Sequence, residues 1–184
     1  MRVEIRFVGL GGQGIIKAGL ITATAACIYC NKNAVLTQSY GPESRGRISR
    51  SEVIISDDEI DFLMATEPDI LVLMAQHAYD RYADSVKKGG IIILDPDLIP
   101  REKKIEDAKV FRVPATRIAE SLGERITANI VMLGALTAIT GVIDVEAMIK
   151  AIRENIPEGL EVNLEAFKKG YEYGENLLRA SLPL

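Results

Sequence analysis

The sequence of 184 residues contains only two cysteines, one histidine and no tryptophan. Cys27 and Cys30 are too few to hold an iron–sulfur cluster or a structural zinc ion without other ligands, and His77 lies far from them in sequence. No Ser, His and Asp set for nucleophilic catalysis can be assembled either. We therefore expect no metal site and no catalytic residue within this chain.

The two cysteines have the C-x-x-C spacing of redox motifs. They fall at the end of a predicted helix, where the helix dipole raises a thiol pKa instead of lowering it. We expect Cys27 and Cys30 to be buried packing groups. For His77, a solvated or capping position at the start of a helix is expected.

Long apolar runs and an excess of one charge are also absent. The uncharged stretch from Ala18 to Cys30 is too short to cross a bilayer. The 26 acidic and 22 basic residues are spread along the chain and give a net charge of -4. This pattern predicts a soluble, cytoplasmic protein without a nucleic-acid or membrane partner.

Hydrophobic residues make up 48% of the sequence, which is enough to bury a core. No repeat, low-complexity block or Pro/Gly/Ser-rich linker divides it. We therefore predict a single domain over residues 1–184 with a helical C-terminal part.

Strands and helices alternate in the sequence. Continuous apolar runs at Ile70 to Met74 and Ile91 to Leu94 are typical of strands covered on both faces. The remaining strands are predicted at 3–8, 34–39, 48–55 and 109–113, with helices at 13–30, 76–86, 127–139, 144–155 and 164–180. This order favours an α/β fold, a Rossmann-like three-layer sandwich with a mostly parallel sheet.

A glycine-rich turn, residues 9–14, follows the first strand and leads into a helix. Its N–H groups would approach an anion such as a phosphate at the helix N-terminus. The spacing matches G-x-G-x-x-G, but the ribose-binding acid of dinucleotide folds is missing, and Gln38 and Ser39 stand in its place. Three interpretations remain: a dinucleotide, another phosphate-bearing or anionic group, and tight strand–helix packing alone.

A second polar segment, residues 37–47, follows the strand that we expect beside the first one. Arg45 and Arg47 could clamp a carboxylate or phosphate, and the alternative is a surface loop with ordinary salt bridges. The candidate binding residues of the two segments are Gly11, Gly12, Gln13, Gly14, Ser39, Tyr40, Gly41, Glu43, Ser44, Arg45, Gly46 and Arg47.

Near the C-terminus, Phe167, Tyr171, Gly174 and Leu178 form one helical stripe, with Gly170 beside it. The stripe is expected to be core. Its glycines would permit a close approach by another helix, from this chain or from a partner.

Three linked motifs resemble the gamma subunit of 2-oxoacid:ferredoxin oxidoreductases, most closely the 2-oxoglutarate branch. They are the glycine turn, residues 38–46 (QSYGPESRG) and residues 50–61 (RSEVIISDDEID). Asn129 with Leu133-Gly134, and residues 163–170, resemble later landmarks of the family. One difference is that the family usually reads Arg-Gly-Gly where this chain has Arg45-Gly46-Arg47, and the extra guanidinium would narrow or recharge the site.

The resemblance implies oxidative decarboxylation of a 2-oxoacid to its acyl-CoA, with electrons passed to ferredoxin, as in anaerobic metabolism. Thiamine diphosphate and Mg would lie in alpha and beta subunits, and iron–sulfur clusters in the beta subunit or in a ferredoxin-like delta subunit. This chain would be inactive alone and would help to bind coenzyme A through its glycine turn and Arg45 or Arg47. The alternatives are a free-standing nucleotide-binding dehydrogenase and a purely structural interaction domain.

Overall fold

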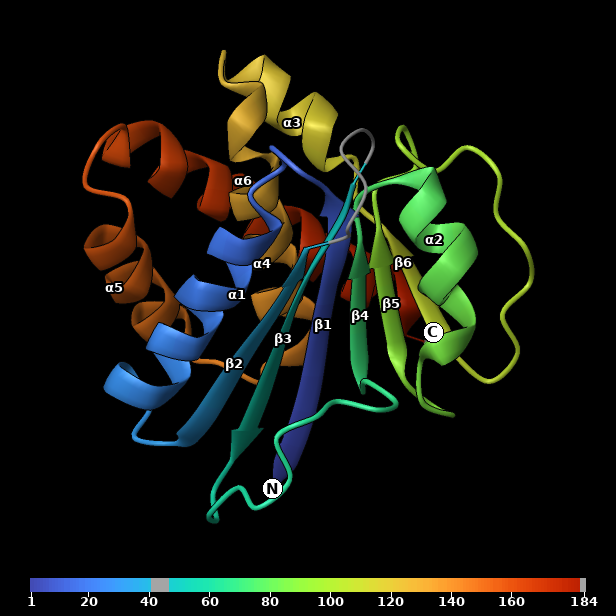
Figure 1. Ribbon diagram of the computed structural model, residues 1–184. Coiled ribbons are helices and arrows are strands. Elements are labelled where there is room, and N and C mark those ends of the chain that lie inside the picture. The colour runs from blue at the N-terminus through green and yellow to red at the C-terminus, as the bar shows by residue number, and fades with distance from the viewer. Residues whose placement is uncertain (41–46, 183–184) are drawn as a thin grey trace.

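The computed structural model describes residues 1–40 and 47–182. A six-stranded sheet runs through the molecule in the order β2-β3-β1-β4-β5-β6 (Figure 1). Its strands are β1 (Arg2–Leu10), β2 (Asn33–Tyr40), β3 (Ile48–Ser56), β4 (Ile70–Leu73), β5 (Ile91–Leu94) and β6 (Lys109–Arg112). Only β3 runs against the others, because it pairs antiparallel with both β1 and β2 while β4, β5 and β6 continue in parallel from β1. The mixed α/β fold with a mostly parallel sheet is thus confirmed.

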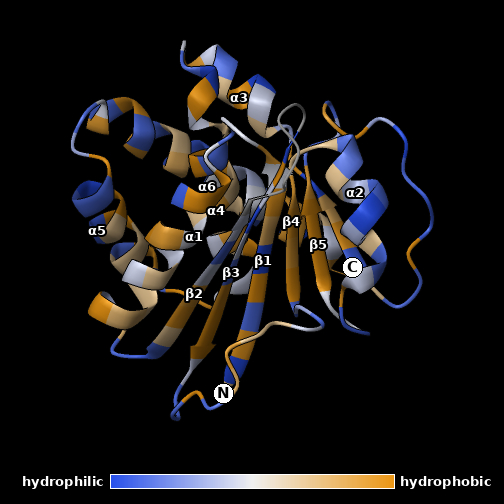
Figure 2. Ribbon diagram, viewed as in Figure 1, coloured by the Kyte–Doolittle hydropathy of each residue, from blue (hydrophilic) through white to orange (hydrophobic). Residues whose placement is uncertain are grey.

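The two faces of the sheet are covered unequally. On one side of the sheet lie α1 (Ile15–Thr24), α3 (Ala115–Ser121), α4 (Ala128–Thr140), α5 (Val145–Asn155) and α6 (Leu160–Ser181), and this side holds the larger hydrophobic core. On the other face, α2 (Gln76–Tyr82) packs over β4 and β5 in a smaller core. Figure 2 shows β4 and β5 to be hydrophobic, as burial on both faces requires.

The order of the strands differs from our expectation for β2. We predicted that the second strand would lie beside the first, but β3 lies between them and β2 is an edge strand. A short connection after β2 returns the chain as an antiparallel strand, which takes the place beside β1. The N-terminal end of β3 therefore lies next to the C-terminal end of β1, where Leu10 pairs with Ile48.

Several element boundaries also differ. The first helix begins at Ile15 and continues as a π-helical turn, η1 (Ala25–Tyr29). There Cys27 is exposed and Cys30 is partly buried, so the prediction of buried thiols was wrong for Cys27. His77 is exposed in the first turn of α2, as expected. The helix α3 was not predicted, and α6 begins at Leu160, four residues before its predicted start.

The glycines of the C-terminal stripe do permit a close helix approach, and the neighbour is α4 of the same chain. A Cβ atom on Gly170 would collide with the carbonyl oxygen of Val131, and one on Gly174 would lie 2.9 Å from the carbonyl oxygen of Ala135. Gly134 of α4 fits in the same way against the backbone of Phe167. The stripe is therefore internal core, and α4 and α6 touch backbone to backbone.

This packing generates a prediction for stability. We expect Gly170→Ala to lower the free energy of unfolding by about 1–3 kcal/mol, because the added methyl group meets backbone that cannot move aside. The matched control is Lys169→Ala on the exposed side of α6, which should stay within about 0.5 kcal/mol of the parent. Urea unfolding of both variants measures the difference. Equal stability of the two variants would contradict the backbone contact.

Candidate functional site

The glycine turn lies at the point in the sheet from which the chain adds later strands on opposite sides. From β1 the chain passes to β2 and β3 on one side, and from β4 it passes to β5 and β6 on the other. Ligands of open α/β sheets bind outside the carboxyl ends of the strands at such a point. The end of β1, at Leu10, and the start of α1, at Ile15, both lie there.

Gln13 fastens this part of the turn. Its Oε1 accepts a hydrogen bond from the Leu10 N–H at 2.7 Å, and its Nε2 donates to the carbonyl oxygen of Met74 at 2.7 Å. The Gln13 N–H donates to the Leu10 carbonyl at 3.2 Å. Both atoms of the side-chain amide and the backbone N–H are therefore hydrogen-bonded. Gln13 thus joins β1 to the end of β4 and positions its glycine neighbours.

Gly14 is fixed by its neighbour on α4. It adopts φ +74°, and a Cβ atom there would collide with the side-chain amide nitrogen of Asn129. That Nδ2 atom donates to the Gly14 carbonyl at 3.1 Å, and Asn129 Oδ1 accepts from the N–H of Ile130 at 2.9 Å. Only glycine satisfies both the backbone conformation and the close approach. The pair links the N-terminus of α1 to that of α4.

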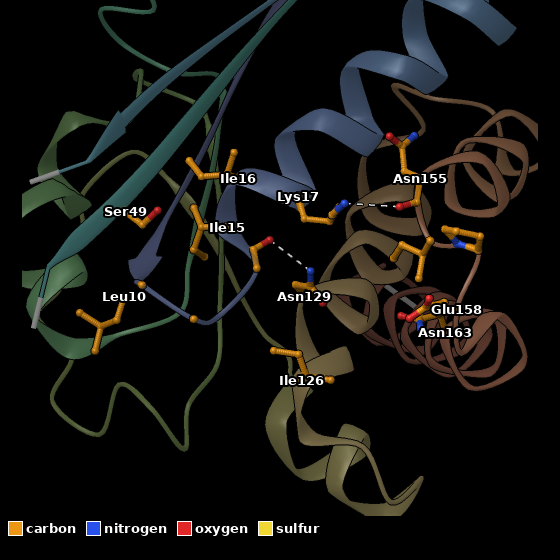
Figure 3. Close-up of a pocket in the computed structure, with 15 residues that line it drawn as sticks. Leu10, Ile15, Ile16, Lys17, Ser49, Ile126, Asn129, Asn155, Glu158 and Asn163 are labelled. Atoms are coloured by element: carbon orange, nitrogen blue, oxygen red, sulfur yellow. Dashed lines mark hydrogen bonds between the residues drawn. The ribbon is translucent and has the colours of Figure 1, made fainter.

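A cavity of about 670 Å³ opens beside this pair (Figure 3). Its wall brings together the glycine turn, the start of β3, the N-termini of α1, α4 and α6, and the C-terminus of α5. The lining residues are Leu10, Gly11, Gly12, Gly14, Ile15, Ile16, Lys17, Ser49, Ile126, Asn129, Asn155, Ile156, Pro157, Glu158 and Asn163.

The cavity wall is suited to an anion at its glycine end. The first hydrogen bond within α1 runs from the Ala18 N–H to the Gly14 carbonyl at 2.9 Å, so the N–H groups of residues 15–17 have no acceptor within the helix. These groups carry the positive end of the α1 dipole. Lys17 adds a positive charge, and its Nζ lies 3.4 Å from the Asn155 carbonyl (Figure 3).

The second predicted segment meets the first at one described point. The Gly11 N–H donates to the carbonyl oxygen of Arg47 at 3.1 Å, and the Arg47 side chain is exposed. Ser39 is exposed on β2, and Tyr40 ends that strand. The predicted positions Gly41, Glu43, Ser44, Arg45 and Gly46 lie outside the described residues.

Several lining residues were not among the predicted site residues. Ser49 is buried, with 5% of its surface exposed, and lines the cavity from β3. Asn129 and Asn163 were expected only as landmarks of the family, and no role was predicted for Ile126. The sequence contains a weak signal for Asn129, because an asparagine at the start of an apolar helix is typical of a cap or a polar contact.

The strand order bears on the dinucleotide interpretation. In dinucleotide-binding folds the acid that binds ribose ends a parallel strand beside the first. Here the antiparallel β3 occupies that place, and among the described residues its N-terminal end carries Ile48 and Ser49, with Arg47 directly before it. The described part of the fold therefore has a glycine turn after β1 without a parallel second strand beside it.

Comparison with known proteins identifies the family. The model of the pyruvate ferredoxin/flavodoxin oxidoreductase family matches residues 4–173. The chain belongs to this family. It is 53% identical over 180 residues to the 2-oxoglutarate synthase subunit KorC of Methanocaldococcus jannaschii, covering 96% of both chains. Among solved structures it resembles the keto/oxoacid ferredoxin oxidoreductase gamma subunit of Geobacter sulfurreducens, with a TM-score of 0.83, 42% identity and coverage of 94% and 98% of the two chains.

A longer chain of known structure shares the fold. The 2-oxoglutarate:ferredoxin oxidoreductase of Magnetococcus marinus matches 95% of this chain with a TM-score of 0.84 and 24% identity. The match covers only 31% of the Magnetococcus chain. In the part of the present chain that the structure describes, no helix is long and apolar enough to cross a membrane, and no group of three His, Cys, Asp or Glu residues could hold a metal ion.

The link between Gly14 and Asn129 can be tested by paired substitutions. We expect Gly14→Ala to destabilise the protein by at least about 1 kcal/mol more than Gly12→Ala, because both glycines have positive φ but only Gly14 meets a side chain. In the double variant Gly14→Ala/Asn129→Ala, the loss should be smaller than the sum of the two single losses. Denaturant unfolding gives these differences, and strict additivity would show that the two side chains do not meet.

Proposed function

We propose that this chain is the gamma subunit of a multisubunit 2-oxoglutarate:ferredoxin oxidoreductase. The complex would decarboxylate 2-oxoglutarate oxidatively, form an acyl-CoA and pass electrons to ferredoxin. The observation that carries this proposal is the 53% identity, over nearly the whole of both chains, to a 2-oxoglutarate synthase subunit. We take residues 1–184 as a single gamma-type domain, in agreement with the family match over residues 4–173.

The chain's own residues support a role in binding and assembly. A [4Fe–4S] cluster takes four cysteine thiolates, and Cys27 and Cys30 are the two cysteines of the sequence. This donor set does not fit a cluster, so we assign the electron carriers, with thiamine diphosphate and Mg, to alpha and beta partner subunits or to a ferredoxin-like delta subunit. The gamma chain would complete the complex and help to bind coenzyme A.

Coenzyme A suits the chemistry of the glycine turn. The coenzyme carries phosphates, and the α1 N-terminus has N–H groups without an acceptor within the helix, with the exposed Arg47 beside Gly11. The related Magnetococcus structure contains 2-oxoglutarate, coenzyme A and succinyl-CoA. We propose that the twelve candidate positions of the two segments frame this phosphate-binding region, with Gln13 acting through its backbone partners.

The subunit role is tested by reconstitution. We expect no 2-oxoglutarate oxidation from the purified chain with thiamine diphosphate, coenzyme A and a viologen dye, and CoA-dependent activity once the partner subunits are added. The complex should prefer 2-oxoglutarate to pyruvate. Turnover by the chain alone, at the rate of the complex, would overturn the subunit role, and a preference for pyruvate would overturn the substrate assignment.

The role of Arg47 is tested on the assembled complex. Arg47→Ala should raise the KM for coenzyme A about 10-fold, the lower range for a hydrogen bond to a charged group at an exposed position. The KM for 2-oxoglutarate should not change, because only binding of the coenzyme is weakened. Arg153→Ala, which removes another exposed arginine on α5, is the control. A coenzyme A KM within twofold of the parent would exclude Arg47 as a ligand.

A further inference from the structure

The segment that joins β3 to β4, residues 57–69, exposes three large apolar side chains in succession. Phe62, Leu63 and Met64 are 56%, 52% and 65% exposed. Figure 1 shows this segment near the N-terminus, at the end of the sheet away from the glycine turn. Single apolar residues on a surface are ordinary, whereas a contiguous exposed group is typical of an interaction site. We call these three residues the apolar tripeptide.

Two arginines of β1 hold the backbone of the apolar tripeptide against the sheet. Arg2 Nη2 donates a hydrogen bond to the Phe62 carbonyl at 2.9 Å. Arg6 Nη2 donates to the Ala65 carbonyl, directly after the tripeptide, at 2.7 Å. The backbone on both sides of the exposed side chains is therefore fixed to the strand.

The sheet surface beneath this segment is polar. Because Ile5 and Phe7 belong to the larger core, Arg6 between them projects from the other face of β1. There its Nε donates to Glu52 Oε1 at 2.6 Å, and its Nη1 donates to Ser85 Oγ at 2.9 Å. Arg6 and Glu52 are both buried, and breaking a buried ion pair is costly. The apolar side chains of the tripeptide are therefore left outside, where burial against another surface would be favourable.

Acidic side chains surround the apolar tripeptide. Residues 57–67 include several acids and no lysine or arginine. Asp57 pairs with the N-terminal amino group and with Lys32. The other acids are exposed and make no ion pair within the described part of the chain: Asp58, Glu59, Asp61 and Glu67. A complementary surface would have an apolar pocket with lysine or arginine at its rim.

This charge distinguishes between a second copy of the chain and a different protein. Two copies joined through the tripeptide would bring their acidic residues together, in a chain whose net charge is already -4. Like charges facing each other across an interface are unfavourable. A basic surface on another protein avoids this cost and supplies partners for the acids.

The location of the tripeptide is compatible with the site at the glycine turn. In the β1–β3 ladder, Arg2 pairs with Ser56 at one end and Leu10 pairs with Ile48 at the other. The segment 57–69 follows Ser56, whereas the glycine turn follows Leu10. A protein bound at the tripeptide therefore leaves the cavity beside the glycine turn open.

We propose that the apolar tripeptide docks a partner subunit of the oxidoreductase, through an apolar pocket edged by lysine or arginine on that subunit. This inference rests on the proposed function and deepens it, because it names the surface through which the chain joins the complex. The end of the sheet with the glycine turn is then free to bind the coenzyme.

The test measures binding of the purified full chain to the purified alpha and beta subunits by surface plasmon resonance. Phe62→Ser should raise the Kd by about 10-fold or more, because an aromatic anchor is removed. The control Ile28→Ser changes an isoleucine on η1 that is 63% exposed, and its Kd should stay within about twofold of the parent. Both variants should unfold at the same urea concentration as the parent, since both side chains are exposed.

A second pair of variants tests the charge of the surface. Asp61→Lys should lower the association rate constant about threefold or more, because complementary charges speed the encounter. Glu172→Lys makes the same change of net charge at an exposed position on α6, and its rate constant should stay near that of the parent. In complexes assembled at saturating subunit concentration, Phe62→Ser should leave the KM for coenzyme A unchanged.

The outcomes separate the inference from the proposed function. If the parent binds the subunits and Phe62→Ser binds equally well, the inference is overturned while the proposed function stands. Self-association of the parent that Phe62→Ser abolishes, with unchanged subunit binding, assigns the tripeptide to a second copy and also overturns it. If Phe62→Ser fails to fold, an association rate of Asp61→Lys equal to that of Glu172→Lys overturns it. A parent chain that does not bind the subunits overturns the proposed function and the inference together.

Discussion

The contact between Gly14 and Asn129 is the constraint on which the rest of the site depends. The glycine adopts a left-handed conformation that ends the turn after β1, and it has no side chain because the asparagine amide occupies that space. The same amide holds the Gly14 carbonyl and so joins the start of α1 to the start of α4. Residues 115 positions apart are thereby held at one point, and the cavity opens beside it.

Much of the architecture could be predicted from periodicity. The run from Ile91 to Leu94 coincides with β5, because a strand buried on both faces must be apolar at every position. The position of β3 could not be predicted in this way. Alternating residues show that a strand has one buried face, but they do not say which neighbour it pairs with. The seven-residue helix α3 was not predicted, although α2 has the same length and was.

The candidate site was predictable in part for a similar reason. Glycine spacing after a strand reports a local backbone shape, so the turn with Gly11, Gly12 and Gly14 was found from sequence and does line the cavity. Ser49, Asn129 and Asn163 reach the same cavity from three distant parts of the chain. Their proximity arises from tertiary packing, which no local pattern encodes. For Cys27 the local pattern misled, since this residue lies in the π-helical turn η1 and is exposed.

The glycine contacts between α4 and α6 have a mechanical consequence. The helices α4 and α6 touch through Gly134 and Gly170. They cannot slide by one residue without driving a Cβ atom into a carbonyl group, so they move as one rigid unit. Asn129 and Asn163 both lie on this rigid unit, whereas the glycine turn follows strand β1 of the sheet. The hydrogen bond from Asn129 to the Gly14 carbonyl joins this rigid unit to the turn, so a molecule in the cavity would contact two parts whose separation that bond already limits.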